Sequence, residues 1–142
     1  MPRILAIDYG TKRLGLAVTD PQGIIATPLD TVASHEIMNY LVNYISKEEV
    51  RCIVMGDPKT LHNKDSETSE HVHTFANALK KKFPAIPIHF VDERFTSLIA
   101  KNSLIESGQN KKTRRDKAVL DRVSATIILQ TWLEQQQHKH IL

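Results

Sequence analysis

Two short apolar runs close to the N-terminus, residues 4–7 and 14–18, flank a turn that contains Gly10 and two basic residues. Runs of Ile, Leu, Val and Ala on either side of such a turn predict a β-hairpin. Gly10 and Gly15 suit places where the backbone turns tightly or is approached closely by another segment. The hairpin places Asp8 at the end of its first strand, so we expect this carboxylate at the rim of a sheet rather than inside it.

The rest of the chain alternates between extended and helical patterns of apolar residues. The expected elements are a strand at 24–28 after a turn at 20–23, a helix at 34–48 with Ser34 as its N-cap, a strand at 52–55 that ends at Gly56, a polar loop at 57–65, a helix whose apolar face runs from 72 to 83, a strand at 88–91, and helices at 97–107 and 117–136.

This order predicts an α/β fold with a five-stranded mixed sheet flanked by helices. The first three strands form an antiparallel meander, and the later two strands enter the sheet through helical crossovers. A length of 142 residues with 41% apolar and 25% charged residues suits one domain with a real core, residues 1–142. No internal repeat or low-complexity segment interrupts it.

The first residues of the sequence and its single cysteine indicate the cellular compartment of the protein. The first strand reaches Asp8 before a signal-like apolar stretch is completed, and no segment is long and apolar enough to cross a membrane. Cys52 excludes an internal disulfide and fits a small buried side chain in a reducing compartment. We therefore expect a cytoplasmic protein.

Carboxylates occupy three positions that the predicted fold brings toward one edge of the sheet. Asp8 ends the first strand, Asp92 or Glu93 ends the last, and Asp121 lies in the first turns of the final helix. Asp121 shares a helical face with apolar residues such as Ile128, so its carboxylate must be paired, capped or bound to a metal.

Ordinary structural roles are the alternative interpretation of these acids. Asp8 would then be a turn-forming residue. Asp121 would form an ion pair with Lys117 or Arg122, or would favour the positive end of its helix.

Three converging carboxylates are the ligands that a hard divalent cation prefers, and Mg²⁺ or Mn²⁺ is the cofactor we expect. Two such ions about 4 Å apart can activate a water and stabilise the leaving oxygen of a displacement at phosphorus. The histidines do not compete as ligands, because His71 and His73 face differently on a helix and nothing resembles a zinc site.

Basic residues gather in two places that could contact a nucleic-acid backbone. Lys12 and Arg13 lie in the first turn, and the segment 111–117 contributes Lys111, Lys112, Arg114 and Arg115. The alternative for each is ordinary surface charge, since the formal net charge is only +3. Aromatic residues make up 6% of the chain, which argues against readout of single strands by base stacking.

Taken together, these motifs resemble the YqgF family, also called RuvX. The matching segments are DYGTKRLG at 8–15, GDP at 56–58, DERFTS at 92–97, the basic loop, and DRVSATIILQ at 121–130. The resemblance implies an RNase H-like fold and a nuclease that matures the 5′ end of the small-subunit (16S) ribosomal RNA precursor, with ribosomal particles as partners. It also implies Asp8, Glu93 and Asp121 as catalytic metal ligands, which favours Glu93 over Asp92. An older family label implies a Holliday junction resolvase instead.

This chain departs from the family pattern near residue 57. Similar proteins commonly carry a hydrophobic residue between the positions matched by Gly56 and Pro58, and a glycine in the following loop. Here the chain has Asp57 and the segment NKDS at 63–66. The acids are retained, so the departure concerns the shape of a loop beside the site and the choice of substrate.

Two functions of other classes compete with a nuclease. An ATPase or phosphotransferase of the actin and sugar-kinase type is one, because Asp8, Gly10 and Gly15 also resemble the phosphate turn of that superfamily. The chain has no room for the second lobe of such an enzyme. The other is a non-catalytic RNA-binding factor of ribosome assembly. RNA and structured DNA both stay candidate substrates, and the monomer and the homodimer both stay candidate states.

Overall fold

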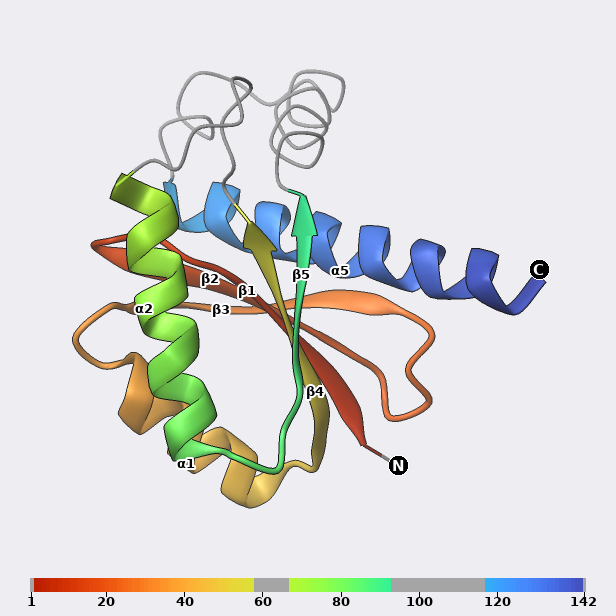
Figure 1. The fold of residues 1–142 in the computed structure, drawn as a ribbon, viewed down its shortest axis with the longest axis horizontal. Helices are drawn as coiled ribbons and strands as arrows, with labels where there is room; N and C mark the ends of the chain where they lie inside the picture. Colours follow the sequence, from red (N-terminus) through yellow and green to blue (C-terminus); the bar gives the residue numbers. More distant parts are fainter. Residues whose placement is uncertain (1, 58–66, 93–116, 142) are drawn as a thin grey trace.

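The computed structural model describes residues 2–57, 67–92 and 117–141, and its core is one sheet with helices on both faces (Figure 1). In chain order the described elements are β1 (Arg3–Asp8), β2 (Arg13–Thr19), β3 (Ala26–Ala33), α1 (Ile37–Lys47), β4 (Val50–Asp57), α2 (Glu67–Lys82), β5 (Ile88–Asp92) and α5 (Lys117–Ile141).

The sheet has five strands in the order β3-β2-β1-β4-β5. β1 and β2 pair antiparallel, as do β2 and β3, whereas β4 is parallel to both β1 and β5. This arrangement confirms the predicted meander followed by crossover strands. Because β1, β4 and β5 run in the same direction, their last residues, Asp8, Asp57 and Asp92, all lie at one edge of the sheet.

Alternating side chains of the strands build a separate core on each face of the sheet. In β1, Leu5 and Ile7 pack with residues of α1 and α2, whereas Ile4 and Ala6 pack with residues of α5. β4 continues both cores and lies between β1 and β5, and its residues from Cys52 to Gly56 are buried, as its apolar sequence predicted. Cys52 is buried in the α5 core.

The third strand differs from its prediction at 24–28, because β3 begins at Ala26 and continues to Ala33. Ile24 and Ile25 instead donate their backbone N–H groups to Oδ1 of Asp20 at 2.8 and 3.0 Å, which holds them in a turn. Pro28 does not end the strand. β3 is an edge strand, and its register with β2 shifts beside this proline, so the missing N–H group breaks no ladder.

The first helix also begins later than predicted. α1 starts at Ile37 with Glu36 at its N-cap position, and no side chain caps it. Ser34, the predicted N-cap, donates its backbone N–H to the carbonyl of Lys12 at 2.9 Å. It therefore ties the end of β3 to the turn before β2 and does not start the helix.

The remaining predicted elements are placed correctly where the structure describes them. β4 is longer at both ends than the predicted 52–55 and includes Gly56 and Asp57, so the polar loop begins after the acid. α2 ends before Pro84, β5 ends one residue later than expected, and α5 extends five residues beyond 136. The predicted helix at 97–107 and the rest of the loop at 57–65 lie outside the described residues.

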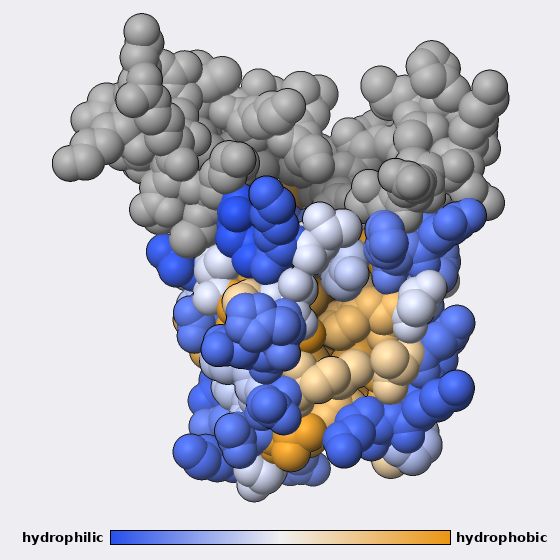
Figure 2. Space-filling model, turned by 90° about the vertical axis from the view of Figure 1, so that its left-hand side faces the viewer, coloured by the Kyte–Doolittle hydropathy of each residue, from blue (hydrophilic) through white to orange (hydrophobic). Residues whose placement is uncertain are grey.

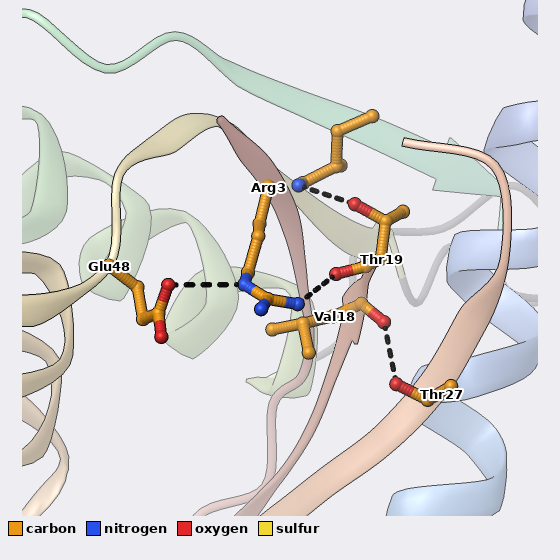
Figure 3. A network of polar contacts seen from close by, with 6 residues as sticks. Arg3, Val18, Thr19, Thr27 and Glu48 are labelled. Atoms are coloured by element: carbon orange, nitrogen blue, oxygen red, sulfur yellow. Dashed lines mark hydrogen bonds and ion pairs between the residues drawn. The ribbon is translucent and has the colours of Figure 1, made fainter. Parts of the chain in front are cut away.

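Polar contacts fix the start of β1 against the end of β2 (Figure 3). Ile4 donates its backbone N–H to Oγ1 of Thr19 at 2.9 Å, and the Thr19 side chain is fully buried. Arg3 donates to the carbonyl of Thr19 at 2.9 Å and forms an ion pair with Glu48 at 3.2 Å. Thr27 of β3 donates to the carbonyl of Val18 at 3.1 Å nearer the surface.

Seen from the left-hand side of Figure 1, the surface carries a hollowed apolar area bordered by polar side chains (Figure 2). Partly buried hydrophobic residues such as Tyr9, Leu29 and Met38 surround the core beneath α1 and α2.

No helix in the described part of the chain is both long and apolar enough to span a membrane.

Replacing Thr19 with Val should lower the free energy of unfolding by about 1–3 kcal/mol, because the buried N–H of Ile4 loses its acceptor. The Thr27→Val variant, at a more exposed hydrogen bond, should change it by no more than about 0.5 kcal/mol. Urea unfolding of both variants measures the difference. Equal losses would show that the Thr19 hydroxyl has no special role.

Candidate active site

Asp8 faces the side of the sheet that α5 covers. It is the last residue of β1 and is half-buried. Ile4 and Ala6 point into the α5 core, so strict alternation along the strand puts Asp8 on the same face. Its partner in the β1–β2 register is Gly15. The predicted position at the rim of the sheet is therefore where the structure places Asp8.

Gly15 brings Asp121 to the same place. A Cβ atom on residue 15 would overlap the backbone carbonyl of Asp121 and would lie 2.9 Å from the Asp121 Cβ. The backbone of α5 therefore touches β2 at this point, as a glycine inside a strand often indicates. Residues opposite one another in antiparallel strands have Cα atoms about 4.5–5.5 Å apart. Asp121 thus lies beside the residue that faces Asp8.

An ion pair holds the Asp121 side chain. Nε of Arg13 donates to Oδ2 of Asp121 at 2.6 Å, and the two side chains are 34% and 21% exposed. Ala125, Ile128 and Trp132, which follow Asp121 on its helical face, are buried in the α5 core. An acid on this face needs a partner, and no sequence pattern predicts Arg13 in that role, because it lies 108 positions away.

The turn between β1 and β2 forms one wall of a small cavity beside Asp121. Gly10 allows the tight turn, because a Cβ atom there would overlap the carbonyl of Arg13. The cavity has a volume of about 300 Å³ and is lined by Gly10, Thr11, Lys12, Arg13 and Asp121. Lys12 is exposed at its rim. The cavity thus places two basic side chains and a carboxylate around a space open to solvent.

Asp57 lies at the same edge but belongs to the opposite face. It is the last residue of β4 and pairs in register with Asp92 of β5. Met55 and Ile53 pack in the α1–α2 core, so alternation directs Asp57 to that side. Its Oδ1 atom is buried and has no hydrogen-bond partner among the residues that the structure describes. The acid that departs from the family pattern therefore lies in a strand rather than in the loop.

Several predicted site residues lie outside the described part of the chain. They are Glu93, Lys111, Lys112, Arg114 and Arg115. Glu93 directly follows Asp92, the last residue of β5. Within the described ranges no three His, Cys, Asp or Glu side chains form a metal site, and the third predicted ligand falls outside those ranges.

The described donors have the chemistry that Mg²⁺ or Mn²⁺ requires. Asp8 and Asp121 offer carboxylate oxygens, which these hard cations prefer over nitrogen or sulfur. Both acids are partly shielded from solvent, and their mutual repulsion favours a bound cation. The residues present therefore fit a divalent metal.

Other titratable groups are less suited to chemistry. Burial raises the pKa of the Cys52 thiol, so the thiolate nucleophile is disfavoured. His71 and His73 are exposed on α2. A second cavity of about 440 Å³, bordered by Arg51, His89 and Trp132 among others, lies toward the C-terminal half of α5, away from Asp121.

Comparison with known proteins supports the family resemblance that the sequence motifs indicate. The family model described as "RuvX: Holliday junction resolvase" matches residues 2–135. A protein of Phocaeicola vulgatus named "Putative pre-16S rRNA nuclease" is 49% identical over 138 residues, which is 97% of this chain and 99% of the relative. A protein of the same name from Christiangramia forsetii is 50% identical over 133 residues, covering 94% and 98% of the two chains.

Solved structures show the same fold. Thermus thermophilus RuvC in complex with Holliday junction substrate superimposes with a TM-score of 0.56 at 15% identity, over 90% of this chain and 92% of that one. At this level of identity the likeness concerns the fold alone. It confirms the predicted RNase H-like architecture.

Replacing Gly15 with Ala should displace α5, because the new methyl group meets backbone rather than a movable side chain. We expect a loss near the upper end of the about 1–3 kcal/mol typical of overpacking. The emission of Trp132, the only tryptophan, should shift to longer wavelength as its packing in the α5 core loosens.

Gly23→Ala is the matched control. A Cβ atom there would meet only Cδ1 of Ile4, at 4.0 Å in ordinary van der Waals contact, but φ is +74°, so the strain should cost roughly 1 kcal/mol without a change in Trp132 emission. Urea unfolding followed by fluorescence compares the two variants. A smaller loss at residue 15 than at residue 23 would contradict the close packing described above.

Proposed function

Because the chain belongs to the RuvX family, we propose that it is a metal-dependent endonuclease that processes the 5′ end of the 16S ribosomal RNA precursor. The observation that carries this proposal is the placement of Asp8 and Asp121 side by side through Gly15, within a match that covers nearly the whole chain. Relatives named as pre-16S rRNA nucleases support RNA as the substrate.

Asp8 and Asp121, with Glu93 as the third ligand, would hold one or two Mg²⁺ or Mn²⁺ ions. When bound, such ions activate a water for attack on phosphorus and stabilise the leaving oxygen. The contact of α5 with β2 at Gly15 brings the backbones of two of the three acids together before any substrate arrives.

Basic residues around the site would bind the nucleic-acid backbone. Lys12 is exposed at the rim of the cavity beside Asp121, where it can reach a phosphate. Further contacts with the backbone would come from Lys111, Lys112, Arg114 and Arg115. The protein would act in the cytoplasm, on free precursor RNA or on ribosomal particles.

A Holliday junction resolvase is the second candidate, because that is how the matching family model is described. Such an enzyme would be expected to work as a homodimer, since two strands must be cut symmetrically. A third possibility, a non-catalytic assembly factor, would bind RNA and cut neither substrate. One assay can compare all three.

The assay follows cleavage of an end-labelled ribosomal RNA precursor beside a four-way DNA junction, with Mg²⁺ and with Mn²⁺. We expect cutting of the RNA by the native protein and a loss of at least about 100-fold in Asp121→Asn, which weakens a metal ligand. Glu48→Gln makes the same charge change far from the site, in the ion pair with Arg3, and should cut normally.

Each outcome of this assay assigns a function. Preferential cutting of the junction would establish the resolvase. Binding of RNA without cutting, with either metal, would establish the assembly factor and overturn the proposed nuclease. Equal activity of Asp121→Asn and native protein would show that the site lies elsewhere.

The basic loop generates a separate prediction for binding. Reversing Arg114 and Arg115 to Glu should weaken RNA binding and reduce the slope of log K against log salt by about 1–2, because two phosphate contacts are lost. Reversing Lys80 and Lys81, exposed in the last turn of α2, changes the net charge equally and should leave the slope nearly unchanged. Equal slopes in the two variants would show that Arg114 and Arg115 do not contact RNA phosphates.

A further inference from the structure

We propose that Arg13 serves as an internal cation at Asp121 and that a divalent metal must displace it in order to bind. The proposal rests on the proposed function, since it concerns the same metal site. It assigns Arg13 a positioning role that differs from a simple contact with nucleic acid. Arg13 would keep the acids at the edge of the sheet compensated until the metal arrives.

The first observation is the ion pair itself. Nε of Arg13 lies 2.6 Å from Oδ2 of Asp121, slightly shorter than the about 2.7–2.9 Å usual for charge-assisted N–H···O hydrogen bonds. With 34% and 21% of the side chains exposed, the pair is partly shielded from solvent. Water therefore weakens this attraction less than it would weaken a surface ion pair.

The second observation is the position of the pair beside Asp8. Gly15 pairs with Asp8 in the sheet and lies against the backbone of Asp121, so the fold brings two acidic residues to the same glycine. Neighbouring like charges repel one another. Arg13 begins β2, two residues before Gly15, and supplies the described positive charge that contacts Asp121.

The same position makes Arg13 a competitor of the metal. A divalent cation bound to Asp121 would lie beside the Arg13 guanidinium, which already donates to Oδ2 of that carboxylate. The two positive charges would repel one another and would compete for this oxygen. Arg13 also borders the cavity of about 300 Å³ beside the turn, which gives its side chain space to move into.

The opposite role would be that of a supporting residue. Groups that hydrogen-bond to metal ligands often orient them, and their removal then weakens metal binding by about 10- to 100-fold. A supporting guanidinium and a competing one thus predict changes of opposite sign. The sign of the change in metal affinity separates them.

The test is calorimetric titration of Mn²⁺ into the full chain without nucleic acid. Arg13→Gln should bind Mn²⁺ about 3- to 10-fold more tightly than the native protein, which is the affinity equivalent of a partly shielded ion pair. Arg51→Gln makes the same substitution at an exposed residue near the start of β4, at the opposite end of the sheet from Asp121, and is the matched control. Its Mn²⁺ affinity should change by less than about twofold, because a distant exposed charge is screened.

Stability provides a readout that does not depend on titration heats. Metal-free Arg13→Gln should unfold at a lower temperature than native protein, and saturating Mn²⁺ should raise its unfolding temperature by more than it raises that of the native protein. Arg13→Lys retains the charge without the guanidinium fork and should fall between the two in both measurements. This variant keeps the test valid if Arg13→Gln does not fold.

Unchanged or weaker Mn²⁺ binding in Arg13→Gln would overturn the inference and leave the proposed nuclease intact. An equal gain in Arg51→Gln would also overturn it, because the effect would then be one of net charge. Absence of Mn²⁺ binding in every variant, native protein included, would overturn the inference together with the metal site.

Discussion

The contact between Gly15 and the backbone of Asp121 is the constraint on which the site depends. A side chain at residue 15 would prevent α5 from reaching β2. Because Gly15 also pairs with Asp8, the missing methyl group allows two acidic residues more than a hundred positions apart in the chain to meet at one glycine. The buried residues that follow on α5, from Ala125 to Trp132, then hold the helix in that position.

The two faces of the sheet differ in role, because one carries the larger apolar core and the other carries the candidate site. Large apolar side chains fill the face covered by α1 and α2, whereas the α5 face has smaller residues such as Ala6 and Ala17 that let the helix approach closely. The acids and Arg13 gather where this approach is tightest. Partial shielding from solvent strengthens the Arg13–Asp121 attraction and also the repulsion between the carboxylates. A cation bound to these acids would change both interactions.

Much of the fold follows from local sequence patterns. The apolar runs before Asp8 and after Arg13 predict the hairpin. The apolar face of α2 and the uninterrupted apolar run in β4 predict those two elements. Gly15 indicates that another segment approaches β2 closely, but it does not indicate which segment. Family resemblance, rather than periodicity, favours Glu93 over Asp92, and Glu93 lies outside the described residues.

What the sequence does not reveal depends on tertiary contacts. Ile24 and Ile25 look like a strand, yet the carboxylate of Asp20 holds their N–H groups in a turn. Ser34 looks like a helix cap but bonds to Lys12. Arg13 and Asp121 are 108 positions apart, so no local pattern joins them.

The most direct measurement is a crystal structure of protein soaked in Mn²⁺, with the ion located by its anomalous scattering. We expect an ion bonded to carboxylate oxygens of both Asp8 and Asp121, with the Arg13 guanidinium turned away from Asp121. An ion bound elsewhere, or none at these two acids under saturating Mn²⁺, would show that Asp8 and Asp121 do not form the metal site.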